Sequence, residues 1–317
     1  MGATGILYDP LFLEHTTGTG HPETPRRLTH IVHTLQEKGL WNQVEHPAVP
    51  PADRSVLERI HPRDYISHIE TACISGQPFV DTPDCAIGYD SYSVALAAAG
   101  ATVEGVRLIL EGSLTNGMVL TRPPGHHAEI HQAMGFCFFN NIALAARYAL
   151  DEWQLNRIVI LDFDVHHGNG TQHIFETDSR VLYISTHQYP FYPGTGTKEE
   201  TGLGDGLGTT RNFPLPGGTR DDVFLDIYQN SVPDLVARFQ PELILLSAGF
   251  DAHQLDPLGG LKISTEAFAT ISTLFQAWAD EWCQGRLLSV LEGGYHWEAL
   301  ADSVACHVEA LIRSENT

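Results

Sequence analysis

Short apolar runs alternate with helical patterns along this chain, and this alternation constrains the fold more than any other feature. The runs are rich in Val, Ile and Leu and have no polar side, as in IVIL at 158–161. Such runs are typical of strands buried on both faces of a parallel sheet. Six strands are expected, at 4–8, 117–121, 157–163, 181–186, 242–248 and 286–291.

Helical patterns fill most of the intervals between these runs. Leu28, Ile31, Val32 and Leu35 form one apolar stripe within 22–38, as expected of an amphipathic helix. Further helices are expected at 91–111, 140–150, 221–239, 264–282 and 296–313. The sequence therefore predicts an α/β fold with a parallel sheet and helices on both faces. No repeat or linker divides the chain, so we expect a single domain over residues 1–317.

Residues 189–220 differ from the rest of the chain, being rich in Gly and Pro without any periodicity. A loop of this length inside a compact domain usually serves function. Its glycines are not followed by the GK[ST] sequence or by a helix start, which argues against a phosphate-binding loop.

The chain carries 39 acidic and 18 basic residues, a net charge of −21. Such a surface repels nucleic acid and anionic membranes, and it attracts cations such as lysine-rich peptides or polyamines. Solubility or a salty habitat would explain the same charge.

The five cysteines form no CxxC pair, and the apolar runs, such as 243–250, are too short to span a bilayer. We expect free thiols in a reducing cytoplasm, and neither nucleic acid nor membrane as a partner.

Polar clusters follow four of the expected strands, at the point where each strand ends. They are RPPGHH (122–127), DFDVHHGNG (162–170), AGFDAH (248–253) and EGGY (292–295). Ligands of open α/β sheets bind at the carboxyl edge of the strands. Four clusters at this edge indicate a functional site, because single Asp or His residues there would more simply serve as helix caps.

Asp164 and His166 are two positions apart in an extended segment, so their side chains point to the same side. Asp162 shares that side, one step deeper, and Asp251 arrives at the same edge from another strand. Two carboxylates and one imidazole leave a coordination position open, which is typical of a catalytic divalent metal. This ligand set suits Zn²⁺, with Fe²⁺ as a substitute.

The adjacent histidines His126 and His127 are either a second metal site or a pair that transfers protons. A binuclear site needs extra bridging carboxylates, which the sequence around Asp251 does not supply. Tyr295 follows two glycines, which suits a phenol that moves in to hydrogen-bond an oxyanion. A buried tyrosine bonded to backbone is the alternative.

These motifs resemble the zinc-dependent histone deacetylases over essentially the whole chain. The matching segments, in order, are HPETPRR (21–27), RPPGHHA (122–128), GFCFFNN (135–141), DFDVHHGNGTQ (162–172), PGTG (193–196), SAGFDAHQLDPLGG (247–260) and LEGGY (291–295). The HHGNGTQ form is most similar to the class II enzymes and their bacterial relatives. The resemblance implies the arginase/deacetylase fold, with about eight mostly parallel strands, and one catalytic domain over 1–317.

The resemblance also implies roles for the residues at the strand ends. Zinc would bind Asp164, His166 and Asp251. His127 would be the general base and His126 its electrostatic partner, bonded to Asp162. Asn169 would orient His127, and Tyr295 would polarise the scissile carbonyl. A structural potassium ion would lie near Asp162, Asp164, His166, Ser185 and Thr186.

Five further residues would contact the substrate if the resemblance holds. Phe136 and Tyr192 would wall an acyl-lysine tunnel, although most family members have Phe at the second position. Gly135 would offer its carbonyl to the substrate N–H, and Asp84 aligns with a rim aspartate that holds substrate backbone. Leu258 stands where the polyamine-preferring branch carries a glutamate.

The implied activity is hydrolysis of an N-acyl group, most simply acetyl, from a lysine side chain. An acetylpolyamine amidohydrolase with the same machinery is the nearest alternative. A non-catalytic acyl-lysine reader is disfavoured because Tyr295 and the three zinc ligands are all present. A binuclear ureohydrolase is disfavoured by the missing carboxylates. Acyl-chain length and oligomeric state stay open.

Overall fold

Seven parallel strands form one sheet in the computed structural model, which describes residues 3–312. The strands within this range are β1 Ala3–Leu7, β2 Leu114–Val119, β3 Ile158–Asp162, β4 Val181–Gln188, β5 Thr210–Leu215, β6 Leu243–Ala248 and β7 Leu287–Leu291. Their order across the sheet is β1-β2-β7-β6-β3-β4-β5, and every neighbouring pair is parallel. The α/β fold with a parallel sheet is confirmed.

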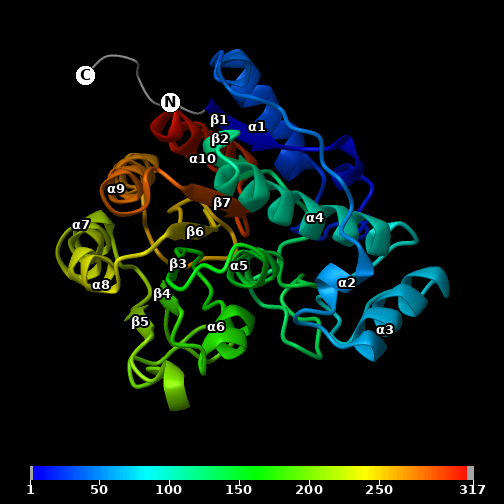
Figure 1. Ribbon diagram of the computed structural model, residues 1–317. Coiled ribbons are helices and arrows are strands. Elements are labelled where there is room, and N and C mark those ends of the chain that lie inside the picture. The colour runs from blue at the N-terminus through cyan, green and yellow to red at the C-terminus, as the bar shows by residue number, and fades with distance from the viewer. Residues whose placement is uncertain (1–2, 313–317) are drawn as a thin grey trace.

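Helices cover both faces of this sheet, as expected when βαβ crossovers join parallel strands. The helices are α1 Arg26–Glu37, α2 Arg54–Leu57, α3 Arg63–Ile74, α4 Ser91–Leu110, α5 Asn141–Glu152, α6 Asn169–Phe175, α7 Asp221–Asp226, α8 Val232–Phe239, α9 Thr265–Cys283 and α10 Trp297–Leu311. Figure 1 shows α7 to α10 on one side of the sheet and α4 to α6 on the other. The central strands are therefore buried on both faces.

The strand order places the four predicted polar clusters beside one another. These clusters follow β2, β3, β6 and β7, which are the adjacent strands β2-β7-β6-β3 of the sheet. After β2 the chain forms β3, which does not neighbour β2 in the sheet, and β6 and β7 later take the two positions between them. A change of direction in the strand order opens a crevice at the carboxyl edge of the sheet. The topology thus brings together residues up to about 170 positions apart.

The interval 189–220 is not entirely a loop, which corrects the sequence prediction. It contains the short helical turn Gly204–Gly206 and the strand β5. β5 lies at the edge and pairs with β4 alone, so Pro214 within it removes no ladder hydrogen bond on a second side. Proline is tolerated in edge strands, but its presence in this segment argued against a strand when only the sequence was considered.

The predicted helices are present, with shifts at their ends. The 22–38 helix begins at Arg26, after Pro22 and Pro25, and the 221–239 helix is α7 and α8 joined by a π-helical turn. Residue 313, the last of the helix predicted at 296–313, lies outside the described residues. The helices α2, α3 and α6 were not predicted.

The helix α4 is long and apolar enough to cross a membrane by length and composition alone. The prediction that the apolar stretches are too short to do so is wrong for this helix. Its most apolar window is 72% buried inside the protein, where it packs against α5 and the sheet. The core helices of folded domains have the same character.

Candidate active site

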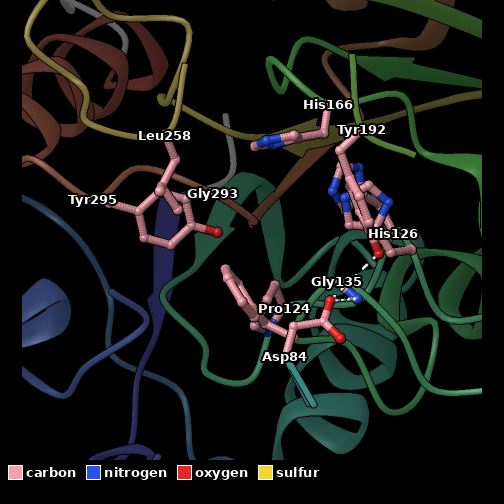
Figure 2. A pocket seen from close by; sticks show the side chains of 11 residues that line it. Asp84, Pro124, His126, Gly135, His166, Tyr192, Leu258, Gly293 and Tyr295 are labelled. Carbon is pink, nitrogen blue, oxygen red and sulfur yellow. Dashed lines mark hydrogen bonds between the residues drawn. The ribbon is translucent and has the colours of Figure 1, made fainter. Parts of the chain in front are cut away.

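Residues from three of the four strand-end clusters line a pocket of about 170 Å³, and Asp251 of the fourth cluster contacts His166 in its wall. Figure 2 shows its side chains converging from several segments of the chain, with Tyr295 and Leu258 opposite Tyr192. The residues that line it are Asp84, Pro124, His126, His127, Gly135, Phe136, His166, Tyr192, Leu258, Gly293 and Tyr295. Nearly all the predicted catalytic and substrate-binding residues therefore meet at one place.

Asp164, His166 and Asp251 lie close enough to share one metal ion. Each offers a ligand atom, and these atoms all lie within 4.8 Å of one another. Nδ1 of His166 is 3.0 Å from Oδ1 of Asp164 and 3.2 Å from Oδ2 of Asp251. Both aspartates are fully buried. The predicted ligand set is thus assembled, with one imidazole facing two carboxylates.

Backbone groups hold both carboxylates in place. The N–H of Val165 donates to Oδ1 of Asp251 at 2.8 Å, and the N–H of Gly293 donates to Oδ2 of Asp164 at 2.8 Å. A Cβ on Gly293 would lie 2.0 Å from Oδ2 of Asp251, so only glycine allows this close approach. The first glycine of the EGGY segment is therefore needed for space between the two aspartates.

The charges of these three residues are strongly coupled. Burial and the neighbouring Asp164 raise the pKa of Asp251 to about 7. Burial alone would lower the pKa of His166, but its hydrogen bonds to the two aspartates raise this pKa to about 10. Two negative charges are thus buried next to each other, which is unfavourable unless positive charge lies between them. A divalent cation bound to both carboxylates would supply that charge.

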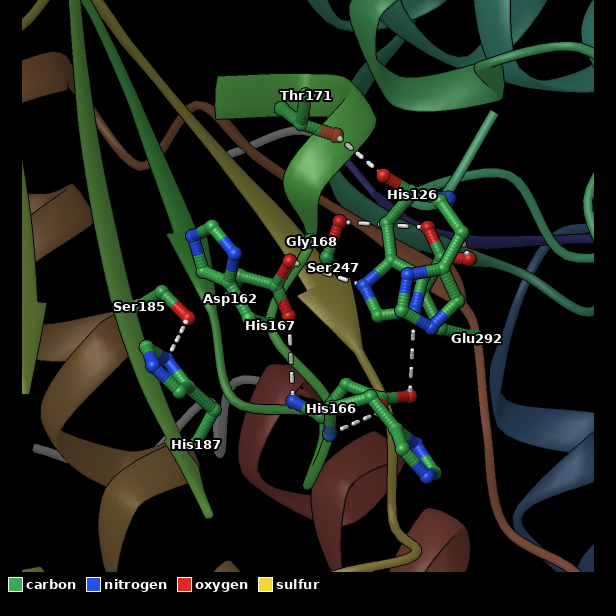
Figure 3. Close-up of polar contacts among 12 residues, drawn as sticks. His126, Asp162, His166, His167, Gly168, Thr171, Ser185, His187, Ser247 and Glu292 are labelled. Atoms are coloured by element: carbon green, nitrogen blue, oxygen red, sulfur yellow. Dashed lines mark hydrogen bonds and ion pairs between the residues drawn. The ribbon is translucent and has the colours of Figure 1, made fainter. Parts of the chain in front are cut away.

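His126 forms a buried pair with Asp162, as predicted. Nδ1 of His126 is 3.0 Å from Oδ2 of Asp162, and the hydroxyl of Tyr183 donates to the same oxygen at 3.1 Å. Figure 3 shows the His126 ring between Asp162 and Glu292. Burial would lower the pKa of His126, but Asp162 and then Asp164 outweigh it and raise this pKa to about 10. His126 therefore carries positive charge beside its neighbour.

His127 lies against this cation, and its ring centroid is 4.0 Å from that of His126. Burial, followed by the charges of His126 and His166, holds the pKa of His127 well below its usual range. Its Nδ1 is 2.8 Å from Oδ1 of Asn169, the first residue of α6. The two histidines are thus in different charge states, which fits a proton-transfer pair rather than a second metal site.

Tyr295 is buried with its hydroxyl pointing toward the centre of the pocket (Figure 2). Burial raises the pKa of Tyr295 well above its usual range, although Arg27 opposes this shift. The guanidinium of Arg27 lies 5.0 Å from the ring centroid, and the carboxylate of Asp256 accepts from the Tyr295 N–H at 2.6 Å. Gly294, with a φ of 124°, supplies the left-handed turn. The phenol therefore stays protonated and aimed into the pocket.

The walls of the pocket above these groups are aromatic. The Phe136 ring packs edge-on against Tyr295, with 5.8 Å between the centroids, and the Tyr192 ring packs edge-on against His127 at 5.2 Å. At the mouth, the Tyr192 hydroxyl lies 3.5 Å from Oδ2 of Asp84, which also accepts from the Gly135 N–H at 3.0 Å. The extra hydroxyl of Tyr192 thus faces the predicted rim aspartate.

The predicted potassium residues Ser185 and Thr186 lie outside the pocket, on β4. Ser185 is the register partner of Asp162 across β3 and β4, so their side chains lie next to each other. The Ser185 hydroxyl lies 2.8 Å from Nδ1 of His187, and the Thr186 hydroxyl lies 2.6 Å from the hydroxyl of Tyr228. Both hydroxyls are therefore hydrogen-bonded to other side chains.

Three buried or half-buried carboxylates support the site, and the sequence predicted no role for them. Glu292 accepts from the N–H groups of Gly125 and His126 at 2.7 and 3.2 Å. Asp256 holds the Tyr295 backbone, and Glu129 lies behind Asn169. Glu292 could have been found from the sequence, because a charged residue directly after a buried strand needs a partner. Asp256 and Glu129 stand in loops and give no such signal.

Comparison with known proteins agrees with this geometry. The family model described as "Histone deacetylase domain" matches residues 21–311. A "Probable deacetylase" of Archaeoglobus fulgidus is 39% identical over 298 residues, covering 93% of this chain and 82% of the relative. A "Histone deacetylase-like amidohydrolase" of Pseudomonas aeruginosa is 35% identical over 310 residues, covering 92% and 81%.

A solved structure gives the same result for the fold. The crystal structure of the HDA15 HD domain superposes with a TM-score of 0.94 at 33% sequence identity, covering 98% of this chain and 90% of that one. The family match, the relatives and the solved structure agree with one another. The chain belongs to the histone deacetylase family.

Proposed function

We propose that this protein is a zinc-dependent amidohydrolase that removes acyl groups, most simply acetyl, from lysine side chains. The observation that carries the proposal is the convergence of Asp164, His166 and Asp251 within 4.8 Å, at a pocket that Tyr295 and His127 also line. An amide carbonyl inserted into this pocket would meet a metal site, a phenol and a neutral imidazole together.

The residues fit a mononuclear catalytic metal. Asp164, His166 and Asp251 would hold zinc through two carboxylates and one imidazole, which leaves room for substrate and water. Fe²⁺ suits the same ligands. The chemistry that zinc supplies when bound is Lewis acidity, which polarises a carbonyl and makes a water more acidic.

The chain's own residues would handle the protons and the developing charge. Neutral His127 would accept the proton of the attacking water and then deliver it to the leaving amine. The positive charge on His126, fixed by Asp162, would limit how firmly His127 keeps that proton. The Tyr295 hydroxyl would donate a hydrogen bond to the oxygen that becomes negatively charged.

The pocket walls would select a substrate with a slender alkyl stem. Phe136 and Tyr192 would lie along the methylene groups, with Leu258 across from Tyr192 at the mouth (Figure 2). The Gly135 carbonyl would accept from the substrate amide N–H. Asp84 would accept from donors on the substrate outside the pocket.

Two further assignments belong to the same proposal. Potassium would bind oxygens of Asp162, Asp164, His166, Ser185 and Thr186, since β3 and β4 bring the first and fourth of these into register. We place the enzyme in the cytoplasm, where its five cysteines, all free thiols here, would stay reduced.

A panel of amides tests the proposal against its nearest alternative. Zinc-loaded protein should be offered acetyl-lysine peptides, longer acyl-lysine peptides and acetylated polyamines. We expect kcat/KM to be highest for an acylated lysine, because Leu258 offers apolar contact and no charge for a second ammonium. At least about tenfold higher kcat/KM on an acetylpolyamine, about 1.4 kcal/mol, would assign the protein to that small-molecule activity instead.

A further inference from the structure

The side-chain amide of Asn169 joins the predicted base to a carboxylate outside the pocket. Its Oδ1 lies 2.8 Å from Nδ1 of His127. Its Nδ2 donates to Oε1 of Glu129 at 2.5 Å, and it also faces the His127 carbonyl and the Met134 sulfur, each at 3.4 Å. Asn169 is buried, so water does not replace these partners.

The partners of the amide fix which way it points. All three atoms around Nδ2 are acceptors, and a carboxylate such as Glu129 is the strongest of them. The NH₂ end of Asn169 must therefore face Glu129, and the carbonyl end must face His127. A carbonyl oxygen can only accept, so Nδ1 of His127 carries the ring proton. The lone pair then lies on Nε2, the other ring nitrogen.

An amide needs this outside support, whereas a carboxylate in its place would not. Both oxygens of a carboxylate accept, so either orientation would select the same imidazole tautomer. An amide that turned over would present its NH₂ group to Nδ1 and favour the opposite tautomer, with the proton on Nε2. The position of Glu129 therefore decides whether His127 can accept a proton at its Nε2 atom.

We propose that Glu129 is a positioning residue for the reaction, which holds the Asn169 amide in the orientation that leaves Nε2 of His127 free as a base. This inference rests on the proposed deacylase function. Glu129 acts through Asn169 and does not line the pocket.

His173 fixes Glu129 from its other side. Nδ1 of His173 lies 2.8 Å from the same Oε1 that accepts from Asn169. Asn169 and His173 both belong to α6 and lie one turn apart on the same face of this helix. The hydrogen bond to Glu129 also raises the pKa of His173. Glu129 is thus held between two side chains of one helix, which restricts the position of its carboxylate.

The test is a double-mutant cycle of Glu129→Ala and Asn169→Asp in zinc-loaded protein. Glu129→Ala should lower kcat on an acetyl-lysine peptide about tenfold, the low end of the cost of losing an outer partner, with KM nearly unchanged. Adding Asn169→Asp should restore kcat, because its carboxylate needs no support. In the presence of Glu129, Asn169→Asp should instead lower kcat, because the new carboxylate would lie against that of Glu129 and the two negative charges would repel each other.

The matched control is Glu176→Ala, which removes a carboxylate at the C-terminal end of the same helix. It should leave kcat unchanged. A Glu129→Ala variant with wild-type kcat would overturn the proposal. So would a double variant that keeps the wild-type Tm and zinc content but is no more active than Glu129→Ala.

A second readout needs no substrate, so it separates this inference from the proposed function. ¹⁵N NMR of histidine-labelled protein distinguishes the two imidazole tautomers, and loss of the signal in His127→Ala assigns it. We expect the Nδ1–H tautomer in the wild-type protein and a shift toward Nε2–H in Glu129→Ala. Unchanged signals in Glu129→Ala would contradict the proposal even if the protein hydrolyses no acyl-lysine. The expected shift in an inactive protein would contradict only the function.

Discussion

Oδ2 of Asp251 lies 3.2 Å from Nδ1 of His166, although the two residues are 85 positions apart in the chain. The first follows β6 and the second follows β3, and these strands are neighbours in the sheet. This contact exists only because β6, which forms much later in the chain, lies directly beside β3 in the sheet. Metal binding should therefore depend on Asp251 as strongly as on the local pair Asp164 and His166.

The first prediction concerns the metal itself. The purified protein should contain one transition metal ion per chain, and Asp251→Ala should lose both this ion and the activity. Elemental analysis of both proteins measures the ion. Two stoichiometric Mn²⁺ ions per wild-type chain would contradict the mononuclear site.

A second prediction concerns the Tyr295 hydroxyl. Tyr295→Phe should keep its metal and lower kcat by roughly 10²–10³, the loss found when one oxyanion donor is removed. Steady-state kinetics on the best substrate, beside metal analysis, measures this. Phe136→Leu, which alters the ring that packs on Tyr295, is the control for packing and should cost much less. Near wild-type turnover in Tyr295→Phe would show that the phenol serves only the structure.

The third prediction concerns substrate choice at the mouth of the pocket. Leu258→Glu should raise the ratio of kcat/KM for acetylpolyamine to that for acetyl-lysine peptide by about fivefold, since a partly exposed ion pair contributes up to about 1 kcal/mol. Leu258→Gln is the matched control without charge and should change this ratio little. Equal ratios in the two variants would show that residue 258 does not select by charge.

The fourth prediction concerns acid stability. Burial lowers the pKa of His61 and of His307 to about 4, whereas the unfolded chain has the ordinary value of 6.5. Between these values the unfolded state binds the extra proton, so each residue should reduce the free energy of unfolding by about 1.4 kcal/mol per pH unit as pH falls from 6.5 to 4. Above 6.5 this contribution is constant.

Urea unfolding at several pH values measures that slope. His307 lies between the hydroxyls of Ser272 and Ser289, each 2.7 Å from one ring nitrogen, far from the predicted metal ligands in the sequence. His307→Asn should lower stability at neutral pH and flatten the pH slope by one proton. An unchanged slope in this variant would mean that His307 is already protonated in the folded protein.

Much of the fold could be predicted because the strands in its centre are buried on both faces and therefore have continuous apolar sequences. Continuous apolar runs such as Ile158–Leu161 can only lie between two layers of helices, so β3 and its neighbours were found. β5 was missed because an edge strand needs fewer apolar residues and tolerates Pro214. Helix α3 was missed although its buried residues recur at helical spacing, and its apolar face packs against α4 and a second core cluster rather than the sheet.

The sequence predicted the site residues that lie at strand ends. It did not predict those that support the site only by contacting other site residues. Asp164, His166 and Asp251 follow buried strands, where parallel topology brings their side chains together. Glu129 and Asp256 reach the site only through loop geometry, which one-dimensional patterns do not contain. Their contacts with Asn169 and the Tyr295 backbone appear only when the chain is folded.

We propose that this protein hydrolyses the acyl-lysine amide with one bound metal ion. The most direct measurement follows the acetate and the deacetylated peptide formed from an acetyl-lysine peptide by zinc-loaded protein, by chelator-stripped protein and by Asp251→Ala. We predict equal amounts of acetate and deacetylated peptide from the first, and product at the level of the uncatalysed control from the other two. Equal turnover by stripped protein, or no turnover of any acyl-lysine by the zinc-loaded protein, would contradict the account.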